Sequence, residues 1–176
     1  MSPNLVPFAL VNEGLYIVPV IHHNMESALE VRRAIDFFNP SCIAVEVKET
    51  WQKEISRAAE RLPDISIILD GKQEEKDVSC YLCEPCDPAL EALRTGIEKR
   101  IPGYCIDLDV GPYPDVVDFL PDPYAIFRLR LKCYYEAYEK QTVHVLPLEK
   151  DRVREIHMAR RLKELTSSYE RVLLVC

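Results

Sequence analysis

The length, composition and charge of the chain limit the kinds of protein it can be. With 176 residues, 48% of them hydrophobic and 29% charged, it has enough apolar side chains for one globular domain spanning residues 1–176. A formal net charge of −7 argues against nucleic acid as a partner. No apolar run approaches the roughly 20 residues of a membrane helix, and residues 1–10 do not resemble a signal peptide. We therefore expect a cytoplasmic protein whose seven cysteines are reduced.

The chain is expected to open with a β-hairpin. Residues 5–11 and residues 15–21 are both apolar, and the turn-prone triplet Asn12-Glu13-Gly14 lies between them. This predicts an antiparallel strand at one edge of the sheet.

A strand–helix–strand unit follows, spanning residues 15–47. Asn24 is a good N-cap for the helix, and Asn39-Pro40 ends it. One apolar stripe runs along this helix, formed by Val31, Ala34, Ile35 and Phe38. The second apolar run, residues 42–47, is expected to lie parallel to the first strand after a right-handed crossover.

The rest of the chain alternates expected helices and strands. We predict helices at residues 50–62, 87–100, 123–140 and 151–165, and strands at residues 64–69, 104–109 and 171–176. Residues 70–77 are expected to form a surface loop, and the proline-rich residues 111–122 an irregular connection or lid. The predicted fold is α/β, with a mixed, mostly parallel sheet flanked by helices. Its central strands would contain Ile17, Ile43, Cys105 and Leu173.

Two polar residues, His22 and Glu46, end the first two expected parallel strands. Ligands of open parallel sheets bind beyond the carboxyl ends of the strands. A histidine beside a helix N-terminus favours the neutral imidazole that binds metals, and Glu46 would be a second ligand or a general base. The alternatives are that His22 caps the helix and that Glu46 pairs with an arginine.

Charged residues on later elements extend this candidate site. Asp107 and Asp109 end the strand at 104–109 and either complete an acidic metal site with Glu46 or form ordinary turn and ion-pair contacts. In the last helix the apolar stripe is expected to comprise Val153, Ile156, Ala159, Leu162 and Leu165. Arg154, His157 and Arg161 recur on the opposite face, where they are solvated unless Arg154 reaches the carboxylates.

Cys80, Cys83 and Cys86 form a C-x-x-C-x-x-C pattern. Zinc or an iron–sulfur cluster suits this spacing, but no fourth ligand is evident, so we expect ordinary thiols in a surface loop. Elemental analysis of the purified protein tests this.

The sequence contains no G-x-G-x-x-G and no G-x-S-x-G motif, which disfavours the common nucleotide-binding folds and the nucleophile elbow.

Several of these segments, taken in order, resemble the TraB/PrgY family of the broader Tiki/TraB/ChaN/erythromycin-esterase-like superfamily. The family opens with a strand that ends in G-x-x-H, and a second strand reads P-D-x-V-x-V-E-L. Similar to this opening is the segment VPVIHHNMESALEVRRAIDFFNPSCIAVEV, in which His22 falls on the motif histidine and Glu46 on the motif glutamate. EALRTGIEKRIPGYCIDLDV resembles the segment leading to I-D-R-D, with Asp107 and Asp109 on the aspartates. DRVREIHMARRLKEL resembles E-R-D-x-x-M-A-x-x-L, with Arg154 on the arginine.

The resemblance implies a mixed α/β fold and a metal-dependent hydrolase or peptidase. In that interpretation a divalent metal would be bound by His22, Glu46 and Asp107, and the catalytic residues acting on a peptide substrate would be His22, Glu46 and Arg154. The chain departs from the motifs at Pro19, which replaces a glycine, and at Leu108, which replaces an arginine.

The strand at residues 171–176 would lead into a second G-x-x-H, so we expect the site to be incomplete in a chain that stops at residue 176. A core strand at the terminus would also favour a homo-oligomer. The alternative function is a non-catalytic binding or regulatory module that retains the fold. In either case we expect His22, Glu46 and Asp107 to converge at the carboxyl edge of the sheet, with Arg154 nearby.

Overall fold

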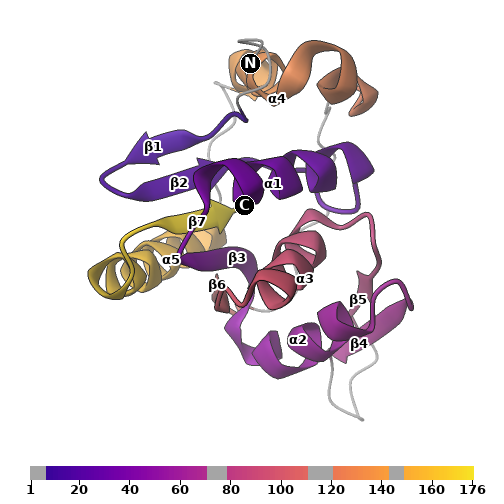
Figure 1. The fold of residues 1–176 in the computed structure, drawn as a ribbon, viewed down its shortest axis with the longest axis vertical. Helices are drawn as coiled ribbons and strands as arrows, with labels where there is room; N and C mark the ends of the chain where they lie inside the picture. Colours follow the sequence, from indigo (N-terminus) through magenta and orange to yellow (C-terminus); the bar gives the residue numbers. More distant parts are fainter. Residues whose placement is uncertain (1–6, 71–78, 111–120, 143–148) are drawn as a thin grey trace.

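A five-stranded sheet forms the centre of the structure, a computed structural model that describes residues 7–70, 79–110, 121–142 and 149–176 (Figure 1). The strands lie in the order β1 (Leu10–Asn12), β2 (Leu15–Val18), β7 (Val172–Val175), β3 (Cys42–Lys48) and β6 (Gly103–Asp107). β1 and β2 are antiparallel, and the other neighbouring strands are parallel. The predicted α/β fold, with its mixed, mostly parallel sheet and N-terminal hairpin, is confirmed.

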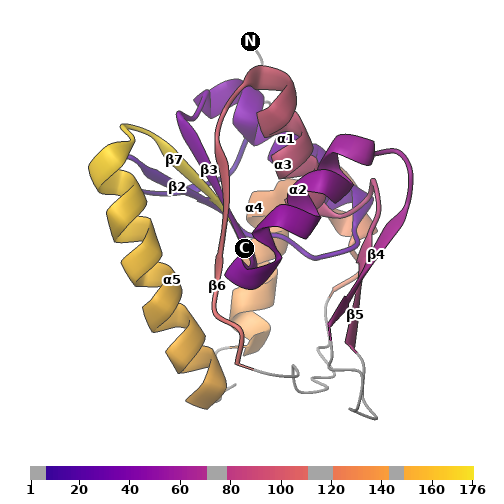
Figure 2. The ribbon, with the colours of Figure 1, turned by 90° about the horizontal axis from the view of Figure 1, so that it is seen from below.

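Helices cover both faces of this sheet. Figure 2 shows α1 (Met25–Phe38), α2 (Gln52–Arg61) and α3 (Pro88–Lys99) on one side and α5 (Glu149–Ser168) on the other. α4 (Tyr124–Thr142) packs against α1. The α1 side buries Val31, Ile35, Ile43, Val45 and Leu90, and the α5 side buries Cys42, Ala44, Ile106, Leu165 and Val172. Each large aliphatic side chain buried in this way contributes about 1.5–3 kcal/mol of transfer free energy.

Local sequence signals determine where the first elements begin and end. The Asn24 side chain accepts a hydrogen bond from Ser27 N at 2.9 Å and caps α1, and Asn39 ends that helix in the left-handed conformation. In the β1–β2 turn, Glu13 and Gly14 both have positive φ, at 43° and 86°. Positive φ at both central residues is typical of the tight hairpin turn whose twist matches its strands.

A separate two-stranded sheet, β4 (Ser66–Asp70) with β5 (Ser79–Cys83), lies beside α2. The sequence analysis did not predict β5 and was wrong to place Cys80 and Cys83 in a loop, because their apolar neighbours pair with β4. Residues 71–78 of the expected surface loop and residues 111–120 of the expected lid lie outside the described residues.

The last strand of the described chain, β7, occupies the middle of the sheet. It pairs with β2 on one side and β3 on the other, so it leaves no open sheet edge. The predicted homo-oligomer therefore cannot rest on an unpaired β7. It stays a prediction.

The predicted sheet-facing stripe of α5 is correct for Leu162 and Leu165 and wrong for Val153, Ile156 and Ala159. Met158, Leu162 and Leu165 pack against the sheet, whereas Val153 and Ile156 are 42% and 54% exposed. Arg154, four residues before Met158, belongs to the inward face and contacts the carboxylates there. Leaving a buried carboxylate without its cation costs about 3–5 kcal/mol, which is comparable with the gain from burying two aliphatic side chains. The observed orientation of the helix satisfies the charge of Asp107.

The Gln52 side chain protects the outer edge of β6. Its amide oxygen accepts from Cys105 N at 2.7 Å, and its amide nitrogen donates to Gly103 O at 3.3 Å. Gln52 thus replaces two hydrogen bonds of a further strand.

Replacing Gln52 with alanine is expected to lower the free energy of unfolding by about 1–2 kcal/mol, because two backbone groups lose their partners. Urea denaturation measures the change. Gln52→Glu is the matched variant, since it keeps the acceptor for Cys105 N but loses the donor to Gly103 O, and it should lose less. Equal stability of Gln52→Ala and the parent protein would contradict the edge-protecting role.

Within the described ranges, no helix is both long and apolar enough to cross a membrane.

Candidate functional site

A cavity of about 530 Å³ opens at the carboxyl edge of the sheet, and we call it the edge cavity. Its lining includes His22 after β2, Glu46 and Lys48 of β3, Trp51, Arg154 of α5 and Cys176 after β7. Three parallel strands therefore end at its wall. The two residues that the sequence placed at strand ends, His22 and Glu46, line this same cavity.

Arg154 joins two carboxylates from neighbouring strands. Its Nη2 lies 2.7 Å from Glu46 Oε1 and 2.9 Å from Asp107 Oδ2, and its Nε donates to Asp107 Oδ1 at 3.0 Å. Asp107 is fully buried and the Arg154 side chain is 14% exposed, so water screens this cluster weakly. We call Arg154, Glu46 and Asp107 the arginine cluster.

The pKa of the Glu46 carboxyl is shifted in opposite directions by burial and by nearby cations. Burial raises the pKa of its carboxyl above the usual value, and this outweighs the nearby Arg154 and His22 cations, which lower it. A carboxylate with a raised pKa is a stronger base than an ordinary one, and its exposed fraction of 24% lets it meet a bound molecule.

His22 is held by Asp87, a residue whose role at the site the sequence analysis did not recognise. His22 Nδ1 lies 3.2 Å from Asp87 Oδ2, while Asp87 Oδ1 accepts from Ala89 N and Leu90 N at 2.9 and 3.0 Å as the N-cap of α3. One buried carboxylate thus starts a helix and orients an imidazole. The Asp-Pro pair indicated the cap, but nothing local to it indicates a contact 65 residues away.

The two partners shift each other's protonation. Burial alone would lower the pKa of His22, but the hydrogen bond and charge of Asp87 outweigh it, so that the pKa lies above the usual value. Burial would raise the pKa of Asp87, but His22 and the backbone N–H groups of Leu90 and His23 hold it below its usual range. Because Nδ1 contacts Asp87, Nε2 is the nitrogen left to act on a ligand.

The turn at His23 supports this arrangement. His23 has a φ of 55°, in the left-handed region that a residue with a side chain rarely adopts. Its backbone N donates to Asp87 Oδ2 at 3.3 Å, and its ring contacts Glu84 at 3.2 Å. The strained backbone is compensated by the contact with the buried carboxylate.

The remaining predicted residues lie in separate ion pairs. Asp109 pairs with Lys48 at 3.0 Å, and Lys48 lies 4.7 Å from the centre of the Trp51 ring. The two strand-end aspartates therefore contact different cations, Asp107 contacting Arg154. On α5, His157 Nε2 lies 3.1 Å from Glu49 Oε2, and Arg161 also pairs with Glu49.

Two cysteine thiols, Cys176 and Cys83, are not activated as nucleophiles. Burial raises the pKa of Cys176 to about 12 and that of Cys83 to about 11, so both are protonated at neutral pH. Cys80 is exposed, Cys83 is buried and Cys86 lies in the turn before α3. The thiols of this pattern therefore lie in different environments, and elemental analysis remains the test of whether they bind metal.

The donor set predicted for a divalent metal is only partly available. His22 and Glu46 face the edge cavity, but both Asp107 oxygens accept hydrogen bonds from Arg154. Among the described residues, no group of three or more His, Cys, Asp and Glu side chains is arranged to hold a metal ion. Catalytic metal sites use about three protein ligands, so this arrangement does not fit a complete one.

The fold is that of an α/β domain, and a cavity lined by His22, Glu46 and Arg154 lies at the carboxyl ends of its parallel strands. No family model, no curated protein and no solved structure matches the chain.

Proposed function

We propose that this chain is the α/β domain of a hydrolase that acts on an amide or ester bond held in the edge cavity, a peptide being the favoured substrate. The observation that supports it is the His22–Asp87 contact, with Glu46 lining the same cavity. A histidine oriented through Nδ1 by a buried carboxylate is arranged to transfer protons through Nε2.

The shifted pKa values favour a division of roles between the two side chains. Glu46, whose pKa is raised, takes a proton from the attacking water. His22, whose pKa is also raised, stays protonated further into the neutral range and gives a proton to the leaving group. Arg154 holds Glu46 in place and adds positive potential for the developing oxyanion.

A metal-dependent mechanism and membership of the TraB/PrgY family remain predictions from the sequence, and the roles above require neither. A metal bound at the edge cavity would use His22 Nε2 and the Glu46 oxygen that does not contact Arg154, with Asp87 orienting the histidine. A cytoplasmic location likewise remains a prediction.

The test is turnover of a library of internally quenched fluorogenic peptides and p-nitrophenyl esters, with and without EDTA and added divalent metals. His22→Gln should reduce kcat at least 100-fold, because it removes the proton donor. The activity should rise with pH through the ionisation of Glu46 and fall through the deprotonation of His22, and Glu46→Gln should abolish turnover because it removes the base. His157→Gln, a histidine paired with Glu49 outside the cavity, is the matched control and should retain activity.

A second candidate is a non-catalytic binding or regulatory module. The arginine cluster favours it, because both Glu46 and Asp107 are engaged in ion pairs with Arg154 within the protein. Equal turnover by the parent protein and His22→Gln, combined with saturable binding of one library member, would support this candidate and reject the hydrolase.

A further inference from the structure

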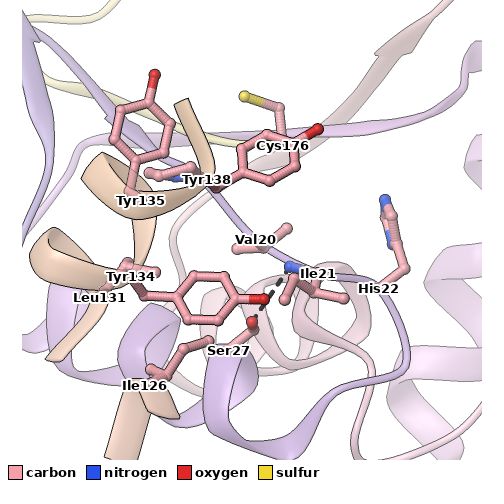
Figure 3. Close-up of a pocket in the computed structure, with 11 residues that line it drawn as sticks. Val20, Ile21, His22, Ser27, Ile126, Leu131, Tyr134, Tyr135, Tyr138 and Cys176 are labelled. Carbon is pink, nitrogen blue, oxygen red and sulfur yellow. Dashed lines mark hydrogen bonds between the residues drawn. The ribbon is translucent and has the colours of Figure 1, made fainter. Parts of the chain in front are cut away.

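A second cavity adjoins the edge cavity, and its lining is largely apolar. It has a volume of about 330 Å³ and lies between α4 and the segment that joins β2 to α1 (Figure 3). Ile126, Leu131, Tyr134 and Tyr138 of α4 form one wall, and Val20 and Ile21 form the other. We call this cavity the tyrosine pocket.

The two cavities share part of their lining. Val20, His22 and Cys176 line both of them, so a molecule that reaches His22 from the edge cavity also reaches the mouth of the tyrosine pocket. The close-up shows His22 at one end of the pocket and the tyrosines of α4 at the other (Figure 3). The edge cavity holds the groups proposed to act on a substrate, and the tyrosine pocket lies next to them.

The polar atoms of the tyrosine pocket are largely occupied by contacts within the protein. The Tyr134 hydroxyl donates to Pro121 O at 2.6 Å, and the Tyr135 hydroxyl donates to Glu139. Ser27 Oγ accepts from Ile21 N at 3.1 Å (Figure 3). A charged group placed there would lose its hydration without gaining partners, whereas an apolar group would gain contact with aromatic and aliphatic side chains.

The size of the pocket also limits its occupant. Pockets that bind whole small molecules have volumes of about 300–1,000 Å³, and this one lies at the lower end. It therefore fits one side group of a longer molecule whose remainder occupies the edge cavity.

We propose that the tyrosine pocket is a specificity subsite that binds an aromatic or branched aliphatic side group adjacent to the bond presented to His22. The role as a substrate subsite rests on the proposed hydrolase function, but apolar binding in the pocket does not. The preferred ligands are thus peptides or acylated amines with a Phe, Tyr or Leu side chain next to the scissile bond.

Binding of the N-acetyl methylamides of phenylalanine, leucine, alanine and glutamate tests the proposal by NMR titration of ¹⁵N-labelled protein. The phenylalanine and leucine probes should bind at least tenfold more tightly than the alanine and glutamate probes, with shifts at Val20, Ile21 and α4 residues. Val20→Phe fills the pocket and should abolish the preference. Tyr138→Ala removes an aromatic wall without touching the core and should weaken the phenylalanine probe at least fivefold.

Phe127→Ala is the matched control, because Phe127 lies on the same helix, is 55% exposed and does not line the pocket. Equal affinity for all four probes, or the same loss from Phe127→Ala as from Tyr138→Ala, would overturn the proposal. Glu46→Gln separates the two proposals, since it should abolish turnover but retain probe binding. A preference among the probes without turnover would support the tyrosine pocket as a binding site and reject the hydrolase. Turnover without any side-chain preference would support the hydrolase and reject the subsite.

Discussion

Replacing Asp87 with alanine should lower the free energy of unfolding by about 3 kcal/mol, a large effect for one side chain. The substitution removes the N-cap of α3 and leaves the backbone N–H groups of Ala89 and Leu90 without their acceptor. It also removes the partner of His22 Nδ1 and His23 N. Urea denaturation followed by circular dichroism measures the loss.

Asp87→Asn separates the two roles of this carboxylate. Asparagine caps helices about as well as aspartate but has no charge, so most of the stability should return while the pKa of His22 falls. In the parent protein the folded pKa of His22 lies above its unfolded value, so protonated His22 adds stability at acidic pH. That contribution is lost as the pH rises through the folded pKa. Asp87→Asn should not show this loss of stability as the pH rises.

NMR titration of the His22 imidazole and urea denaturation between pH 5 and 9 check this prediction together. Asp36→Asn is the control, because Asp36 forms only an exposed pair with Lys99 and should change neither quantity noticeably. An unchanged His22 pKa in Asp87→Asn would show that the two residues do not interact in solution.

Removing the cation of the arginine cluster should be comparably severe. Arg154→Met keeps much of the side-chain volume but removes the guanidinium that faces both oxygens of the buried Asp107, and we expect a loss of about 3–4 kcal/mol of unfolding free energy. Glu46 would lose the same cation, and its pKa should rise further.

The double variant Arg154→Met with Asp107→Asn tests this explanation. If the cost comes from an uncompensated charge, the added Asp107→Asn change should restore at least half of the lost stability. Arg160→Met, on the exposed face of the same helix, is the matched control and should change stability by less than about 0.5 kcal/mol. A loss below about 1 kcal/mol in Arg154→Met would mean that water screens the cluster.

The elements themselves followed from short-range patterns. Asn24, Asn39 and the Asp87-Pro88 pair mark helix ends through contacts within a few residues, and the apolar runs of β3 and β7 read directly as buried strands. The apolar pattern did not predict which face of α5 contacts the sheet. Val153 and Ile156 have helical spacing, yet the inward face of α5 carries Arg154, which pairs with the buried Asp107 and the partly buried Glu46.

By itself the sequence determined the α/β class, most element positions and the polar residues at the ends of β2, β3 and β6, since these depend on local periodicity and capping. Only the tertiary structure decided that β7 inserts between β2 and β3, that Asp87 holds His22, and that Arg154 takes the oxygens of Asp107 expected to bind a metal. Strand order and side-chain partners depend on contacts between residues far apart in the chain, 65 apart for His22 and Asp87 and 108 for Glu46 and Arg154. Such contacts form where the burial of whole faces and the pairing of charges are satisfied together, and no local pattern in the sequence specifies that balance.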